Sequence, residues 1–156
     1  VYGIDFVGGL VGATGSDPDT IVRSYATGRV EASTGAGGLI GYAINDNISN
    51  TYANGNVVSC TLGCGGLIGY LDNGNTVNTS YSTGSVSGTS SSGGLIGYLQ
   101  NSTVTNSFWD TQTSGKSTSA GGTGRTTAQM RTLSTFTGAG WNISTSTTPG
   151  ASVWYL

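Results

Sequence analysis

Hydrophobic and polar residues recur along this chain in a fixed order, about 28 residues apart. A glycine box of the form Gly-Gly-Leu-Val/Ile-Gly stands at 8–12, 37–41, 65–69 and 93–97. Segments that end in an aromatic residue lie between or after the boxes, at 21–25, 48–52, 77–81 and 104–108. Such self-similarity is typical of solenoids, in which each unit buries its apolar face against its neighbours.

Within each unit the apolar positions have the spacing of short strands. No unit holds a long run with apolar residues at i, i+3, i+4 and i+7, which a helical repeat needs. Each unit instead has short segments rich in Val, Ile, Thr and Tyr, separated by Gly, Asn, Asp and Ser. The sequence therefore predicts an all-β, parallel β-solenoid of about four coils, each with three sides, and right-handed because parallel crossovers prefer that hand.

Equivalent positions of stacked coils are expected to form continuous columns of side chains. The predicted buried ladder is Leu39, Leu67 and Leu95 with Ile48, Val77, Val104, Tyr52, Tyr81 and Phe108. Strict alternation predicts an outward hydroxyl column of Ser24, Thr51, Ser80 and Ser107. The same alternation predicts an inward polar column of Arg23, Asn50, Thr79 and Asn106. Because this last column is polar, we expect it at a bend, where it caps backbone groups.

The repeats end near residue 109, and residues 110–156 are rich in Ser, Thr and Gly. We expect this segment to cap the solenoid and to take part in assembly. Thr126 and Gln129 have the spacing of a capping box, which predicts a short helix near 127–133. Trp141 and Trp154 are predicted to form a lid over the last coil, and a sugar-stacking platform is the alternative.

The box, followed by strands similar to Asn-Ser-Tyr-Ala-Thr-Gly, resembles the GLUG-motif repeats of large bacterial and archaeal secreted or surface proteins. The segments 107–111, 119–124 and 126–130 also resemble the usual end of such arrays. The resemblance implies an extracellular β-solenoid, often part of adhesin-like proteins. It implies no common catalytic residues.

Charge and composition agree with a location outside the cell, at the cell surface. Charged residues make up 8% of the chain, against about 25% in an ordinary soluble domain. A net charge of −2 with scattered cations argues against nucleic acid or an anionic membrane as partners. No apolar stretch approaches the roughly 20 residues of a membrane span. The chain opens inside the repeat pattern, so we expect any signal peptide to be absent from this sequence.

Cys60 and Cys64 are the only cysteines, and they flank a short loop before the third box. We expect a disulfide that pins this corner in an oxidising compartment. The alternative is a redox or metal pair, but the chain has no histidine and shows no further ligand for such a site. We therefore expect no cofactor.

The absence of histidine excludes Ser-His-Asp and Cys-His catalysis. A pair of carboxylates remains as the basis of a carbohydrate-active β-helix, which is the alternative to a non-catalytic protein. Asp17 or Asp19, Asp46 and Asp72 are predicted at equivalent corners, where Asp usually bonds to turn backbone. A calcium contact at Asp17 and Asp19 is a weaker alternative. Glycosylation sequons occur at Asn47, Asn78, Asn101 and Asn142, as often as chance gives, with Asn101 at the most exposed corner.

The first coil is predicted to be open. Val1 stands seven residues before its box, as Val30 and Val86 do before theirs, so no aromatic-bearing strand precedes it. We expect copies to associate head to tail through this edge. The predicted contact residues are Val1, Tyr2, Ile4 and Phe6 of one copy and Val153, Trp154, Tyr155 and Leu156 of the next. Flanking repeats of a longer chain are the alternative partner, and a glycan or cell-surface target is a further one.

Overall fold

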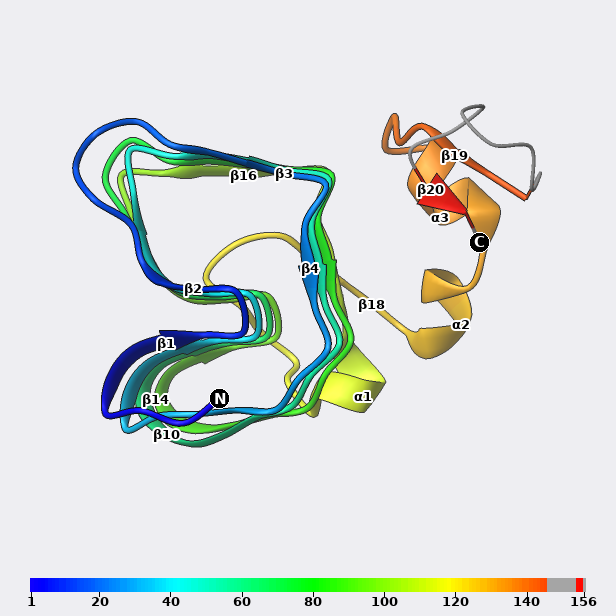
Figure 1. The fold of residues 1–156 in the computed structure, drawn as a ribbon. Coiled ribbons are helices and arrows are strands. Elements are labelled where there is room, and N and C mark those ends of the chain that lie inside the picture. The colour runs from blue at the N-terminus through cyan, green and yellow to red at the C-terminus, as the bar shows by residue number, and fades with distance from the viewer. Residues whose placement is uncertain (146–153, 156) are drawn as a thin grey trace.

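A computed structural model describes residues 1–145, 154 and 155 of the chain. The chain winds into a parallel β-solenoid of about four coils, each of roughly 28 residues, which confirms the fold predicted from the repeats. Figure 1 shows the coils stacked behind one another, with equivalent strands almost superimposed.

Each coil has four sides, not the three that the sequence predicted, and equivalent strands pair in four parallel sheets. The first sheet contains β1 (Asp5–Gly8), β6 (Thr34–Gly37), β10 (Val57–Gly65) and β14 (Val86–Gly93), with β5 (Val30–Glu31) beside β10. The second contains β2 (Val11–Ala13), β7 (Ile40–Ile44), β11 (Ile68–Asp72) and β15 (Ile96–Gln100). The third contains β3 (Thr20–Val22), β8 (Asn47–Ser49), β12 (Thr76–Asn78) and β16 (Thr103–Thr105). The fourth contains β4 (Tyr25–Ala26), β9 (Tyr52–Ala53), β13 (Tyr81–Ser82), β17 (Phe108–Asp110) and β18 (Thr123–Arg125).

The glycine box forms the tight turn between the first and second sheets. Figure 1 shows this turn folded into the outline of the coil, with β1 and β2 running back beside each other. A Cβ atom on Gly65 would lie 1.9 Å from the carbonyl oxygen of Ile68, and one on Gly66 would lie 2.1 Å from that of Gly94. The box is glycine-rich because backbone from the same turn and from the next coil occupies the space of a side chain.

The interior is filled by ladders of aliphatic side chains. Leu39, Leu67 and Leu95 are fully buried and pack with Ile48 and Val77, as predicted. Val104, near the last coil's end, is only partly buried. A second cluster lies behind the first sheet and contains its valines and both cysteines. Its members are Val7, Val30, Ala32, Ala36, Val57, Cys60, Cys64 and Val86.

The predicted polar column lies at the corner between the third and fourth sheets. Arg23, Asn50, Thr79 and Asn106 all have left-handed backbone, with φ of 50°, 55°, 47° and 47°. This confirms the expected bend. Their side chains are exposed or partly exposed and do not point into the core, because the left-handed residue interrupts the alternation of the strand.

For the same reason, the predicted inward and outward positions of the fourth sheet were wrong. Thr51, Ser80 and Ser107 are buried, and the Thr51 hydroxyl donates a 3.0 Å hydrogen bond to that of Ser80. Tyr52 and Tyr81 lie on the outer face, where their rings stack with a 5.1 Å centroid distance. The residues after them, Ala53 and Ser82, face the interior in their place.

Residues 115–122, which follow α1 (Thr111–Ser114), cover the C-terminal end of the solenoid. The indole N–H of Trp109 donates to the Lys116 carbonyl at 3.0 Å, and the Gly94 N–H donates to that of Thr118. The chain then enters β18, which pairs in parallel with β17. The lid over the last coil is therefore this crossing segment, and the prediction that Trp141 and Trp154 form it was wrong.

The remaining C-terminal elements lie beside the solenoid, outside the fourth sheet (Figure 1). They are α2 (Thr127–Met130), α3 (Leu133–Thr137), β19 (Ile143–Ser144) and β20 (Trp154–Tyr155). Thr126 and Gln129 form both hydrogen bonds of the predicted capping box. Phe108, Met130, Phe136 and Trp141 make a third buried cluster that attaches these elements to the solenoid. Of the helices in the described residues, none is long and apolar enough to span a membrane.

Candidate functional site

Exposed large hydrophobic side chains are concentrated on the first coil. Among the described residues there are eight such side chains, and seven of them precede residue 26. Tyr2 is 79% exposed and Ile4 is 70% exposed. The seven are Val1, Tyr2, Ile4, Phe6, Leu10, Val22 and Tyr25, so the predicted edge residues Val1, Tyr2, Ile4 and Phe6 all belong to this surface.

The same end carries the open backbone edges of all four sheets. β1, β2, β3 and β4 are each the terminal strand of their sheet and pair on one side only, with the second coil, within the part of the chain that the structure describes. For example, the Asn47 N–H donates to the Asp19 carbonyl at 2.9 Å, whereas Thr20, which is equivalent to Asn47, has no preceding coil among the described residues. Such an edge is a template for strand addition.

A column of polar side chains also begins at this coil. Each member accepts the backbone N–H of its counterpart one coil earlier. Asp46 Oδ1 accepts from Asp19 at 3.2 Å, Asn75 Oδ1 from Asp46 at 2.9 Å, and Ser102 Oγ from Asn75 at 3.3 Å. Asp19 is the first member, and its carboxylate accepts no hydrogen bond from the described residues.

The outer tyrosines of the fourth sheet form a second column with an open end. The rings of Tyr25 and Tyr52 lie 5.0 Å apart with an interplanar angle of 3°. Burial, with a smaller contribution from Tyr52, raises the pKa of Tyr81 to about 12. Tyr25, at the other end of the column, is 59% exposed, and its ring stacks only on Tyr52 among the described residues.

The opposite end of the solenoid is uneven. The chain itself extends the fourth sheet through β18, and residues 118–120 hydrogen-bond to the backbone of Gly94 and Ile96 at the fourth glycine box. Within the described residues the other three sheets end one strand earlier, at β14, β15 and β16. Among the described residues, the first coil is therefore the flat end of the solenoid, and the C-terminal end is stepped.

The C-terminal strand has a partner inside its own chain. β20 pairs in parallel with β19, with Trp154 opposite Ile143 and Tyr155 opposite Ser144. The Trp154 ring lies 5.7 Å from that of Tyr81, on the flank of the solenoid. Within one chain, the structure thus keeps Trp154 and Tyr155 away from the open edge that the sequence paired them with. The other two residues of this predicted contact, Val153 and Leu156, lie outside the described residues.

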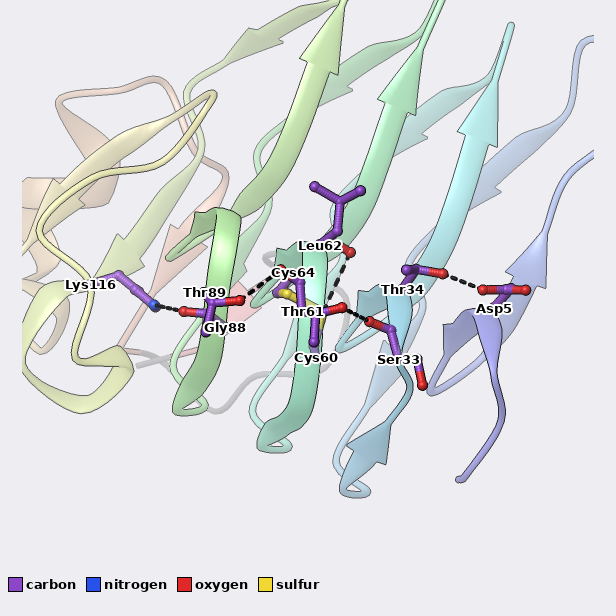
Figure 2. The surroundings of a disulfide bond; sticks show 10 residues. All are labelled: Asp5, Ser33, Thr34, Cys60, Thr61, Leu62, Cys64, Gly88, Thr89 and Lys116. Carbon is purple, nitrogen blue, oxygen red and sulfur yellow. Dashed lines mark hydrogen bonds between the residues drawn. A yellow bond between two sulfur atoms is a disulfide. The ribbon is translucent and has the colours of Figure 1, made fainter.

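Cys60 and Cys64 form the predicted disulfide, which is buried beside the valine ladder. Figure 2 shows hydroxyl bonds that join the coils next to it. The Thr61 hydroxyl donates to the Ser33 carbonyl at 2.7 Å, and the Thr89 hydroxyl donates to the Thr61 carbonyl at 3.0 Å. The surroundings of the disulfide are those of a structural crosslink.

The acidic residues are separate in the structure. Asp46 is buried, whereas Asp72 accepts a 3.2 Å hydrogen bond from the Tyr42 hydroxyl at a different position of the coil. The predicted equivalence of Asp46 and Asp72 was wrong, because Asp72 pairs in register with Ile44. Asp17 and Asp19 are exposed, and no group of three or more His, Cys, Asp or Glu residues suited to a metal occurs in the described ranges.

The sequon asparagines lie at the surface to different extents. Asn47, Asn101 and Asn142 are exposed and Asn78 is partly buried. Asn101 has left-handed backbone, as expected for a corner, and its side-chain amide donates to Asn73 Oδ1 at 3.0 Å.

Comparison with protein families identifies one part of the chain. Residues 32–58 match the model of the GLUG motif. This GLUG motif spans about one coil and includes the second glycine box and the Tyr52 strand. No curated protein and no solved structure matches the chain.

Proposed function

We propose that this protein is a non-catalytic structural and adhesive module of the cell surface, and that it associates end to end through its open first coil. The observation that carries the proposal is the coincidence, in the first coil, of seven exposed large hydrophobic side chains with four strand edges that are open within the described residues. The disulfide and the 8% content of charged residues support an extracellular location.

The roles of the carboxylates support a non-catalytic protein. Asp46 accepts a backbone N–H of the neighbouring coil, and Asp110 is the N-cap of α1. Asp72 holds the Tyr42 hydroxyl. Each therefore has a structural partner, and glycosidase chemistry needs two carboxylates that face one substrate.

Burial of the first coil favours association for two reasons. The exposed apolar area contributes about 25 cal/mol per Å² when it leaves water. Strand edges gain hydrogen bonds to a new strand, which fixes the orientation of the partner. A first coil that binds the opposite end of the next copy produces a filament, whereas two first coils that bind each other produce a closed dimer.

Sedimentation velocity over a range of concentrations tests the proposal. We expect the parent protein to associate, and we expect Ile4→Lys to remain monomeric because a charge then lies in the buried edge. Leu62→Lys is the matched control, since Leu62 is an exposed leucine of β10 away from this end. A monomeric parent, or an Ile4→Lys protein that associates like the parent, contradicts the proposal.

A further inference from the structure

A cavity of about 340 Å³ lies between the outer face of the fourth sheet and the C-terminal elements. Aromatic side chains supply much of its lining: Tyr81 from β13, Trp141 from the segment after α3, and Trp154 from β20. The cavity is at the small end of the range for ligand sites, about 300–1,000 Å³, which suits a ligand of one ring.

Polar groups at the cavity remain free to bind a ligand. The Thr83 and Thr113 hydroxyls and the Arg131 guanidinium line it and have no hydrogen-bond partner among the described residues. Asp110 also lines the cavity, but its carboxylate already accepts from the backbone of Gln112 and Thr113 and from the Thr127 hydroxyl. The available groups therefore include two hydroxyls, one cation and the indole N–H of Trp154, which is buried with no hydrogen-bond partner among the described residues.

We propose that this cavity binds one pyranose unit of a glycan. A pyranose has an apolar face that packs on an aromatic ring and hydroxyls around its edge that need polar partners. The cavity offers both, with Tyr81, Trp141 and Trp154 for the ring face and with Thr83, Thr113 and Arg131 for the edge. The inference rests on the adhesive part of the proposed function and names its target as a sugar, but it is independent of end-to-end association.

Titration with methyl β-glucoside, methyl β-galactoside and methyl β-glucuronide, followed by tryptophan emission, tests the site. Two of the three tryptophans of the chain line the cavity, so emission reports its occupation. We expect a saturable change in the millimolar range with at least one glycoside. A preference for the glucuronide that disappears in Arg131→Met assigns the carboxylate to Arg131 and supports the site.

Two substitutions and a matched control locate the binding. Thr83→Val and Arg131→Met should each weaken it about fivefold, as the loss of one hydrogen bond predicts. Thr27→Val is the control, because Thr27, Asn54 and Thr83 occupy the same position in successive coils and Thr27 lies outside the cavity. No saturable change with any of the three glycosides overturns the proposal. Binding that is unaffected by both substitutions also overturns it. Sedimentation is measured separately, so a failure of the sugar site is distinct from a failure of association.

Discussion

At the scale of the residue, one left-handed position per coil decides which side chains of the fourth sheet reach solvent. Asn50 and Thr79 have φ of 55° and 47°, and the residue after each of them turns inward. The tyrosines that follow are therefore outside, although their spacing from Ile48 and Val77 suggests the core. Asn adopts this backbone readily, but Thr and Arg rarely do, so the stacked coils hold Thr79 and Arg23 there.

Asp46 is a buried residue that the fold tolerates at a cost. Asn75 occupies the same position in the next coil, and its amide donates to the carbonyls of Ala43 at 3.1 Å and Asp72 at 2.8 Å. A carboxylate cannot donate these bonds, and Asp46 Oδ2 is buried with no partner among the described residues. Asp46→Asn should therefore raise the free energy of unfolding by about 1–2 kcal/mol in urea denaturation. The control Asp17→Asn, at an exposed site, should change it little, and a destabilised Asp46→Asn protein would show that this assignment is wrong.

Tyr81 should make the protein sensitive to alkali. Its pKa is raised from 10.0 to about 12 by burial, so an unfolded chain loses this proton at lower pH than the folded one. The unfolded state then binds fewer protons, and stability falls as the pH rises through this interval, by roughly 2–3 kcal/mol in total. Tyr81→Phe should remove this part of the slope in denaturation curves measured across the interval. Tyr25→Phe is the control: Tyr25 is exposed, so its loss should leave this part of the slope in place. Equal slopes in the parent and in Tyr81→Phe would show that Tyr81 is not the cause.

At the scale of the element, each coil depends on ladders that it shares with its neighbours. Leu67 is fully buried between Leu39 and Leu95, and the backbone N–H of each leucine donates to the carbonyl of the next along the column. Leu67→Ala should cost about 2–5 kcal/mol of stability, because the stacked backbone prevents the cavity from closing. Leu62→Ala, on an exposed leucine of the adjacent strand, should cost about 0.5 kcal/mol or less. Urea denaturation of both variants decides the matter, and similar values for the two would mean that the ladder does not support the fold.

The disulfide should act on one corner only. The two cysteines are only four positions apart, so the bond closes a very short loop. Its removal should therefore lower the free energy of unfolding by less than about 2 kcal/mol. Reduction should speed hydrogen exchange around β10 and leave exchange in the third sheet unchanged. Exchange that becomes faster in every sheet on reduction would show that the bond supports the whole stack.

The elements predicted from sequence were those with a local chemical cause. The period and the glycine boxes identified the stacked strands, Thr126 and Gln129 identified the start of α2, and the cysteine spacing identified the disulfide. The fourth side of the coil was not predicted, because the number of sides depends on the tight turn that the glycine box makes between the first and second sheets. The lid was assigned to Trp141 and Trp154 because the terminal repeats of solenoids need caps and these residues follow the last repeat. The residues that cover the end are mostly small, and they bond through their backbone and through the Ser119 hydroxyl, which composition does not reveal.

At the scale of the whole molecule, the two ends of the solenoid differ in kind. The C-terminal end is crossed by its own chain and is stepped, whereas the first coil is flat and carries seven of the eight exposed large hydrophobic side chains among the described residues. We infer that this flat end is the surface that meets a partner. Tyr25 and Asp19 each end a column of repeated contacts there, and a further coil would continue both columns.

Hydrogen exchange of the parent protein, measured at low and high protein concentration, tests whether the first coil is buried by association. We expect backbone amides in residues 1–25 to exchange more slowly at high concentration, because their open edges become hydrogen-bonded in the assembly. Amides on the flank, in α2, α3 and β19, should exchange at the same rate at both concentrations. Protection that appears on the flank with none in residues 1–25, or no dependence on concentration anywhere, would contradict the claim.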